Sequence, residues 1–315
     1  MTQLQIPEGR DFIFTVFDDT DNATLLNTRP VYDLLSNLGI RTTKSVWVEP
    51  SRGQDLGTSL SDEEYRSWIC QLQADGFEIG FHGVGDGEFA RDEILQGIES
   101  FREILGHYPE VYTNHLSNSH NMYWGRYRFP WPFSWLYSLL EGVKGKGHAH
   151  RGGHIKGSDV YWGDALKEHV RFIRNLTFGD INTIGCDPKM PYRRRATPLA
   201  NYWFSSSDGH TVEEFNDLIA PENIDRLERE GGVCIAYTHF GFGFVDESGA
   251  VNPTFRSRME YLAERNGWFV PTGTVLEHLL AHQGENAASV STWYQQRLTV
   301  RWLIDRIRKR LRYGR

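Results

Sequence analysis

Short apolar segments alternate with helical segments along most of the chain, and this alternation restricts the fold more than any other feature. The apolar or β-branched runs that we expect as strands are 12–17, 44–48, 77–81, 111–113, 181–185, 201–205, 232–237 and 268–270. Near-continuous apolar strands are typical of a parallel sheet covered on both faces. About eight strand–helix units predict a closed or nearly closed β/α barrel, with an open doubly wound sheet as the alternative.

The segments between these runs carry helix signals. Ile94, Ile98, Phe101 and Leu105 recur at helical spacing, and a glycine follows the last of them. Such a stripe predicts an amphipathic helix with one face on a core. The sequence therefore predicts α/β layering rather than an all-helical or all-β fold.

The composition is that of a soluble globular chain. The 315 residues are 39% hydrophobic and 24% charged, and no run approaches the length of an apolar transmembrane segment. The first residues show no secretory signal. The three cysteines, Cys70, Cys186 and Cys234, form no zinc-binding spacing. We therefore expect a cytoplasmic protein.

Two regions depart from the strand–helix pattern. Residues of about 116–160 form a long insertion, in which the stretch 123–137 holds eight aromatic residues. Residues 284–292 are small and polar and suggest a linker. We expect a single barrel domain over 1–283, this linker, and a C-terminal basic helix over 293–315.

The charge of the chain is distributed unevenly. The segment 293–315 holds eight basic residues and one acidic residue, a net charge of +7. Because the whole chain carries −7, residues 1–292 carry −14. An acidic body argues against nucleic-acid binding. The apolar positions of the basic segment are Val300, Leu303, Ile304, Ile307 and Leu311. A basic amphipathic helix is typical of membrane-surface contact, but docking onto the acidic body or a dimer contact also explains the pattern and needs no membrane.

Polar side chains follow most of the expected strands. These strand ends carry Asp18 and Asp19, His82, Asn114 and His115, Asp208, and His239. The carboxyl ends of barrel strands meet at one rim, where active sites form. Carboxylates and imidazoles that converge there are typical ligands of a divalent metal.

Four segments together resemble a known family. FIFTVFDDTD, FEIGFHG, VCIAYTHF and WFVPTGTVLEHL occur in the order and spacing of the motifs of the NodB-like polysaccharide deacetylases, which form carbohydrate esterase family four. The resemblance extends over about residues 12–280. The chain also resembles a divergent branch of that family associated with surface-polysaccharide (O-antigen) gene clusters.

The resemblance implies a deformed TIM-like (β/α) barrel that removes an acetyl group from an amino sugar or polysaccharide intermediate. Carried over by position, Asp18 is the general base, Asp19 and His82 are metal ligands, and His239 is the general acid. The implied metal is Zn²⁺, with Mn²⁺, Co²⁺ or Ni²⁺ as alternatives. Such a metal polarises the acyl carbonyl and acidifies water.

The sequence departs from the family where the third metal ligand is expected. Asp86 stands at the position of the second histidine of FEIGFHG-type motifs. We expect His115 to replace that histidine, because it ends the neighbouring strand, with Asp86 and His120 as alternatives. The Arg-rich third motif of the family is also absent from the corresponding stretch TNHLSNSHNMYWG.

The substrate contacts that we expect are Asn114, Trp124, Arg193 and Asp208. An arginine at the active rim suits a nucleotide-linked or lipid-diphosphate-linked sugar. The sequence leaves three alternatives open: another C–N hydrolase of the superfamily, such as a cyclic-ureide hydrolase or amidase; an inactive or metal-free carbohydrate-binding protein; and a peripheral membrane assembly factor. The basic helix extends the expected location to the inner face of the membrane.

Overall fold

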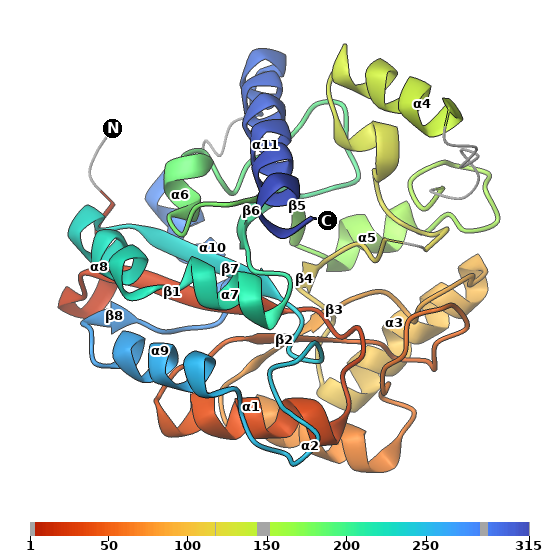
Figure 1. Cartoon of the computed structure of the whole chain (residues 1–315). Coiled ribbons are helices and arrows are strands. Elements are labelled where there is room, and N and C mark those ends of the chain that lie inside the picture. Colours follow the sequence, from red (N-terminus) through yellow and green to blue (C-terminus); the bar gives the residue numbers. More distant parts are fainter. Residues whose placement is uncertain (1–3, 117, 144–151, 284–288, 315) are drawn as a thin grey trace.

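Eight parallel strands form the centre of the molecule, and helices surround them (Figure 1). The computed structural model describes residues 4–116, 118–143, 152–283 and 289–314. The strands are β1 (Phe12–Asp18), β2 (Thr43–Val46), β3 (Glu78–Phe81), β4 (Val111–Tyr112), β5 (Phe172–Phe178), β6 (Tyr202–Asp208), β7 (Val233–Thr238) and β8 (Gly267–Trp268). Their order is β2-β3-β4-β5-β6-β7-β1-β8, and β1 also pairs with β2.

The pairing of β1 with β2 closes seven strands into a barrel, which confirms the predicted fold class. At its carboxyl end β1 pairs with β2, through Phe17–Thr43 and Asp18–Lys44. At its amino end β1 pairs instead with β8, through Phe12–Gly267 and Ile13–Trp268. The barrel is therefore deformed, because β8 occupies the space that opens between the amino ends of β1 and β2.

The helices are α1 (Leu25–Asn37), α2 (Glu63–Ala74), α3 (Arg91–Leu105), α4 (Phe133–Val143), α5 (Gly163–His169), α6 (Thr183–Cys186), α7 (Val212–Leu218), α8 (Pro221–Glu230), α9 (Pro253–Ala263), α10 (Thr272–Gln283) and α11 (Thr292–Tyr313), with short 3₁₀ turns η1 (Pro7–Gly9) and η2 (Gly125–Arg128). The apolar stripe predicted from the sequence is the buried face of α3. The left-handed backbone of Gly106, with φ of 82°, ends this helix. In the described part of the chain, no helix is long and apolar enough to cross a membrane.

One strand prediction is wrong. The run 181–185 overlaps α6, and the fifth strand is the earlier segment Phe172–Phe178. All seven residues of β5 are buried, yet they include Arg174, Asn175 and Thr177. These polar residues interrupt the apolar run by which the other strands were found. The barrel tolerates them because each makes polar contacts. Arg174, for example, pairs with Asp19.

Helix α11 covers the part of the barrel formed by β5 and β6 (Figure 1). The connection from β5 to β6 holds only the four-residue helix α6, which is too short to cover two seven-residue strands. Near the start of α11, Tyr294 donates a hydrogen bond to the buried Asp187, at 2.6 Å. The C-terminal helix thus takes the place of a crossover helix.

The predicted linker and insertion lie partly outside the described residues. Positions 284–288 of the linker, 117 and 144–151 of the insertion, and 315 at the end of the basic helix are not described. Ser289 forms a bridge with Arg193 before α11 begins. The described part of the insertion contains η2 and α4.

Candidate metal and acyl-transfer site

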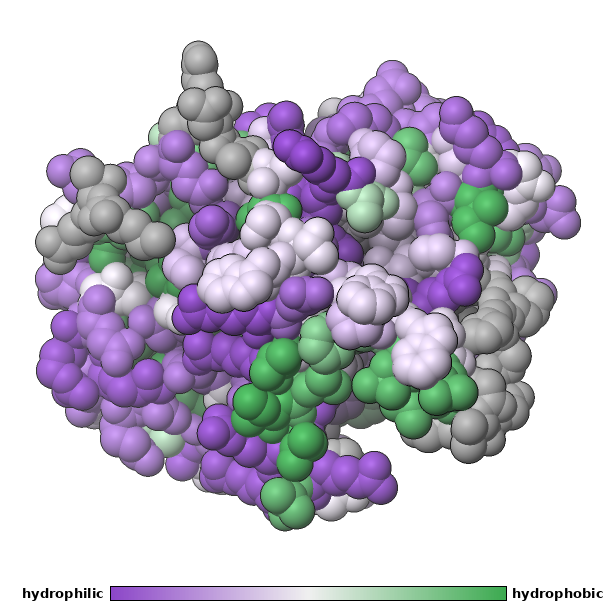
Figure 2. Space-filling model, turned by 90° about the horizontal axis from the view of Figure 1, so that it is seen from above, coloured by the Kyte–Doolittle hydropathy of each residue, from purple (hydrophilic) through white to green (hydrophobic). Residues whose placement is uncertain are grey.

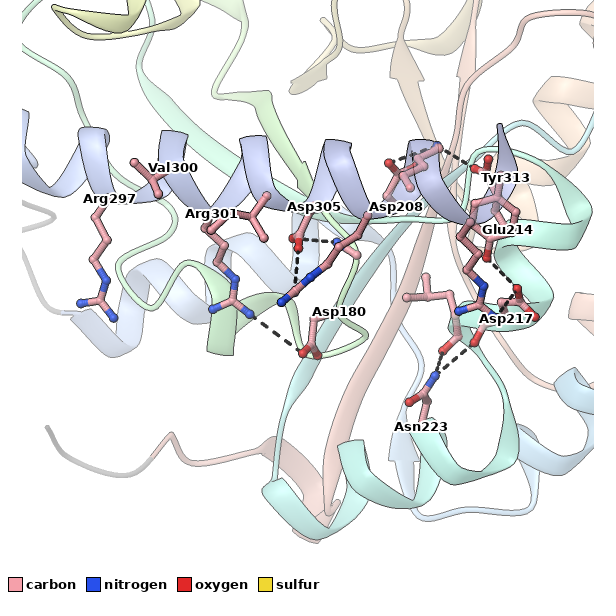
Figure 3. Close-up of a pocket in the computed structure, with 16 residues that line it drawn as sticks. Asp180, Asp208, Glu214, Asp217, Asn223, Arg297, Val300, Arg301, Asp305 and Tyr313 are labelled. Carbon is pink, nitrogen blue, oxygen red and sulfur yellow. Dashed lines mark hydrogen bonds and ion pairs between the residues drawn. The ribbon is translucent and has the colours of Figure 1, made fainter. Parts of the chain in front are cut away.

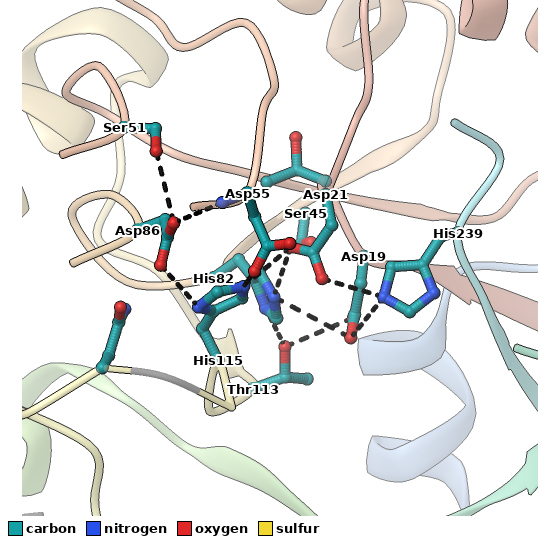
Figure 4. A network of polar contacts seen from close by, with 12 residues as sticks. Asp19, Asp21, Ser45, Ser51, Asp55, His82, Asp86, Thr113, His115 and His239 are labelled. Carbon is teal, nitrogen blue, oxygen red and sulfur yellow. Dashed lines mark hydrogen bonds and ion pairs between the residues drawn. The ribbon is translucent and has the colours of Figure 1, made fainter. Parts of the chain in front are cut away.

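The carboxyl ends of four strands bring acidic and histidine side chains together (Figure 4). Asp19 and Asp21 follow β1, His82 follows β3, His115 follows β4, and His239 follows β7. In the closed barrel β7 is the neighbour of β1 and β3 is the neighbour of β4, and β2 lies between the two pairs. The structure therefore brings four of the residues expected at this rim together, Asp19, His82, His115 and His239, and adds Asp21 to them.

Asp21 lies at the centre of the cluster and faces different partners with its two oxygens. Oδ1 lies 3.2 Å from Nε2 of His82 and 3.3 Å from Nε2 of His115. Oδ2 lies 3.0 Å from Nε2 of His239. Burial would raise the pKa of Asp21, but the charge of His82 and hydrogen bonds from His115 and His239 hold this pKa well below its usual value. The carboxyl group is therefore ionised.

Two atoms of this cluster have the character of metal ligands. Oδ1 of Asp21 and Nε2 of His82 are both buried and lie 3.2 Å apart, and neither has a well-aligned hydrogen-bond partner within the described residues. One ligand atom from each of Asp21, His82 and His115 lies within 4.8 Å of the others. Thr113 engages the other nitrogen of His82, at 2.6 Å from Nδ1, which leaves Nε2 directed at Asp21. This donor set suits a divalent transition metal.

His115 lies between two further carboxylates. Oδ1 of Asp86 lies 3.3 Å from its Nδ1, and Oδ2 of Asp55 lies 3.2 Å from its Nε2. Burial would lower the pKa of His115, but the neighbouring aspartates raise it to about 9. Asp86 thus orients the imidazole from behind, as carboxylates do for histidine ligands. The side chain of Asp55 is 43% exposed, so solvent reaches the cluster from its side.

Arg174 from β5 holds the second aspartate of the FDDTD motif. Its Nη1 lies 2.9 Å from Oδ1 of Asp19, and its Nη2 donates to Oδ2. Both side chains are buried. Burial would raise the pKa of Asp19, but the charge of Arg174 lowers it. Oδ2 of Asp19 also lies 3.9 Å from Nε2 of His82 and 4.0 Å from Nε2 of His239. Asp19 is therefore an ionised carboxylate beside the cluster.

Asp18 points away from this cluster, toward Tyr32 of helix α1 on the outside of the barrel. Its side chain and that of Lys44 are both fully buried, with 3.0 Å between Oδ2 and Nζ. Tyr32 donates to the same oxygen at 3.1 Å, and the backbone N–H of Phe240 donates to Oδ1 at 2.7 Å. Burial would lower the pKa of Lys44, but the charge of Asp18 raises it. These contacts make Asp18 a partner within the core.

His239 is poised to give up a proton. Its Nδ1 lies 3.3 Å from the backbone carbonyl of His210, which leaves Nε2 directed at Asp21. Burial would lower the pKa of His239, but the hydrogen bond and charge of Asp21 raise it. A protonated imidazole at this position is a suitable general acid.

Two of the expected substrate contacts pack against the insertion. Oδ1 of Asn114 accepts hydrogen bonds from Tyr112 and from the backbone of Met122, and its Nδ2 donates to the carbonyl of Met122. Its amide is therefore occupied. Trp124 is half-buried beneath the guanidinium of Arg128, at 4.4 Å.

The other two expected contacts lie away from the cluster. Arg193 packs on Tyr202, the first residue of β6, and donates to its hydroxyl at 2.8 Å. This position is at the amino end of the strand, opposite the rim with the cluster. Asp208, which Figure 3 labels, ends β6, but it pairs with Lys309 at 3.1 Å and with Arg306, both from α11.

The alternative ligand His120 is not part of the cluster. It is fully buried, and its Nε2 lies 3.3 Å from the amide of Asn118. Burial lowers its pKa to about 3, so the imidazole is neutral. The other alternative, Asp86, contacts Nδ1 of His115 and, with Asp55 and His115, forms a second group whose possible ligand atoms lie within 4.8 Å of one another.

Sequence reasoning missed Asp21, Asp55 and Arg174. Asp21 lies in the same FDDTD motif as Asp19, but the motif alone does not say which aspartate turns toward the histidines. Arg174 lies in the strand that was not predicted. Asp55 follows β2 in a loop whose sequence carries no distinguishing signal.

Comparison with known proteins gives the fold a name. No family model matches the sequence, and no curated protein matches it. Among solved structures, PuuE allantoinase matches with a TM-score of 0.51 and 12% identity, over 88% of this chain and 92% of that chain. A probable polysaccharide deacetylase from Pseudomonas aeruginosa PAO1 matches with a TM-score of 0.50 and 12% identity, over 89% and 94%.

The chain has the polysaccharide deacetylase fold. At 12% identity, these comparisons concern the path of the backbone and leave the chemistry to the residues at the rim. The polysaccharide deacetylase fold predicted from the four sequence motifs is thus confirmed.

Proposed function

We propose that this protein is a metal-dependent hydrolase that removes an acetyl group from an amino sugar or a polysaccharide intermediate. The observation that carries the proposal is that the two oxygens of the Asp21 carboxylate face different partners. Oδ1 of Asp21 faces two histidines, and Oδ2 of the same group faces a third. A metal site and a proton donor are therefore adjacent, as hydrolysis of an acyl group requires.

Asp21, His82 and His115 would hold the metal. We prefer Asp21 to the expected Asp19 as the carboxylate ligand, because Arg174 engages both oxygens of Asp19. Two imidazoles and one carboxylate suit Zn²⁺, with Mn²⁺, Co²⁺ or Ni²⁺ as alternatives. A bound divalent metal would supply Lewis acidity, which polarises an acyl carbonyl and acidifies water.

The proton transfers fall to Asp19 and His239. Asp18 was expected as the base, but its carboxylate is enclosed by Lys44 and Tyr32 away from the cluster. We assign this role to Asp19, because its Oδ2 lies beside the cluster, 3.9 Å from Nε2 of His82, while Arg174 keeps it ionised. In the proposed reaction, water attacks the acyl carbon and loses a proton to the Asp19 carboxylate. His239 donates the Nε2 proton to the departing nitrogen or oxygen as the acyl bond breaks. The products are acetate and a free amine or hydroxyl group.

The substrate class rests on the fold and on the acyl-transfer chemistry of the site. A polysaccharide deacetylase and an allantoinase share this backbone, so an acetylated sugar and a cyclic ureide are the two substrates to compare. We favour the acetylated sugar, because all four sequence motifs resemble those of the deacetylases. Arg193 no longer argues for a diphosphate-linked substrate, since it lies at the other end of β6.

The experiment that tests this proposal compares the two substrates directly. Protein freed of metal by chelator is reloaded with Zn²⁺, Mn²⁺ or Co²⁺ and assayed for acetate release from N-acetylated and O-acetylated sugars. Opening of the allantoin ring is assayed in parallel. We expect metal-dependent acetate release that is lost in Asp21→Asn and kept in Asp33→Asn, a matched change at an exposed position on α1. Ring opening without acetate release would favour the ureide hydrolase, and neither activity would favour a binding protein.

A further inference from the structure

Helix α11 turns its basic side chains largely toward the barrel. Lys309 pairs with Glu214 at 2.7 Å and Arg312 with Asp217 at 2.7 Å, while Arg301 lies 3.9 Å from Asp180. Figure 3 shows these pairs along a groove of about 600 Å³ between α11 and the barrel. Pairing with acidic side chains of the barrel therefore accounts for much of the positive charge of this helix.

This orientation leaves an apolar stripe of α11 facing solvent. Val300, Ile304, Ile307 and Leu311 recur at helical spacing, and all four are exposed, although Val300 and Ile304 also border the groove. Ile307 is 61% exposed and Leu311 is 82% exposed. The residues that anchor the helix on the barrel are others, namely Tyr294 and Leu298, which are buried. The stripe is thus not needed to hold α11 in place.

Helix α4 adds a second group of exposed apolar side chains next to this stripe. The exposed side chains are those of Trp135, Leu136, Leu139 and Leu140 in the helix and of Trp131, two residues before it. Gln296 of α11 donates to the carbonyl of Trp131 at 2.7 Å. The rings of Phe129 and Trp302 also pack at 5.1 Å, which joins the insertion to α11.

The two groups form one face, which we call the α4/α11 face. Figure 2 looks onto the side of the molecule where these helices lie and shows green hydrophobic side chains gathered there among pale aromatic and purple polar ones. A soluble monomer rarely exposes so many large apolar side chains together, and such patches mark contact with a protein or a membrane.

Charge distinguishes between a lipid surface and a second copy of the chain. Arg308 and Arg310 are exposed on α11 beside Ile307 and Leu311, and the side chain of Arg308 is 76% exposed. A symmetric dimer through this face would bring these arginines near their own copies, which repels. Anionic lipid headgroups would attract them, while the apolar residues enter the boundary of the acyl chains. Exposed tryptophans suit that boundary.

We infer that the α4/α11 face binds the surface of a lipid bilayer that contains anionic headgroups. The apolar stripe of α11 and the tryptophans and leucines of α4 supply the contact, and Arg308 and Arg310 supply the charge. This inference does not depend on the proposed reaction.

Vesicle co-sedimentation of the full chain tests the inference. Vesicles of phosphatidylcholine are compared with vesicles that also contain phosphatidylglycerol, at low and high salt. We expect binding that is stronger with phosphatidylglycerol and weaker at high salt. The double substitutions Ile307→Asp/Leu311→Asp and Trp135→Asp/Leu139→Asp should each lower the partition coefficient at least about tenfold, because they place charges in the apolar contact.

A matched control and the oligomeric state complete the test. Leu26→Asp changes a leucine on α1 that is 84% exposed, and its vesicle binding should equal that of the wild type. Thermal unfolding verifies that every variant folds. Absence of binding to both vesicle types would overturn the inference, as would equal losses in the Leu26→Asp variant. A dimer in light scattering that Ile307→Asp converts to a monomer would assign the face to a second copy and also overturn it.

Discussion

The Oδ2 atom of Asp21 lies 3.0 Å from Nε2 of His239, whereas Oδ1 of the same carboxylate faces His82 and His115. One side chain thus connects the candidate metal ligands to the candidate proton donor. Because Asp21 is ionised and raises the pKa of His239, its charge serves both functions at once. Substitutions on the two sides of Asp21 should therefore separate metal binding from proton transfer.

The first prediction concerns His239. In His239→Gln the proton donor is lost, while the three proposed ligands remain. We expect the rate constant kcat to fall by about 10²- to 10⁴-fold, the usual contribution of a general acid. Metal content, measured by elemental analysis, should stay at the wild-type level. His107→Gln, at an exposed position, serves as the control for a histidine change. Loss of metal from His239→Gln would show that this histidine is a ligand instead.

The second prediction concerns the buried pair of Arg174 and Asp19. Arg174→Met leaves an uncompensated carboxylate in the core, so we expect the free energy of unfolding to fall by about 3–5 kcal/mol. Adding Asp19→Asn removes the stranded charge and should restore part of that stability, as measured by urea unfolding. The double variant should remain inactive, because the proposed base is missing. Additive losses in the double variant would contradict the pairing.

The third prediction concerns the integration of α11 into the barrel. Leu298 is buried and Leu311 is 82% exposed on the same helix. We expect Leu298→Ala to lower the free energy of unfolding of the whole protein by about 2–5 kcal/mol, as for a core residue. Leu311→Ala should change it by less than about 0.5 kcal/mol. Equal and small effects in chemical denaturation would mean that α11 is a detachable tail.

The fourth prediction concerns stability in acid. Burial lowers the pKa of His120 from 6.5 to about 3, so the unfolded chain takes up a proton before the folded chain does. This stabilisation is complete above pH 6.5 and is lost as the pH falls toward 3, by up to about 1.4 kcal/mol per pH unit. The free energy of unfolding should therefore depend less on pH in His120→Gln than in the wild type. Parallel pH profiles would contradict this role of His120.

The sequence predicted the architecture where local patterns carry it. Apolar runs located β1, β3 and β7, and the residues that follow them include Asp19, His82 and His239. Parallel strands end at one rim, so their convergence could be inferred without coordinates. The placement of His115 beside His82 follows from the same reasoning, because β3 and β4 are neighbouring strands.

The remaining details depend on contacts between distant segments. Residues 18, 19 and 21 all stand in one motif, and only their partners distinguish them: Lys44 encloses Asp18, Arg174 engages Asp19, and the histidines face Asp21. A strand that contains Arg174 shows no apolar run, because a carboxylate 155 residues away compensates the charge. Local pattern does not report such pairings.

The orientation of α11 illustrates the same limit. Its sequence predicts an amphipathic helix. The same sequence leaves open whether this helix docks onto the acidic body, contacts a membrane or self-associates. Pairs such as Lys309 with Asp208 and Arg312 with Asp217 turn its basic side chains toward the barrel. The apolar stripe therefore faces outward, a result that follows from acidic residues on β6 and α7.

The fifth prediction tests the central claim, that Asp21, His82 and His115 form a metal site. Protein stripped of metal is titrated with Co²⁺ and Zn²⁺, and stoichiometry and affinity are measured by calorimetry and by the visible absorption of Co²⁺. We expect one ion per chain in the wild type, the same in Asp33→Asn, and affinity lowered by at least about 100-fold in Asp21→Ala, which removes a ligand. Binding by Asp21→Ala that equals the wild type, or no binding by the wild type, would contradict the account.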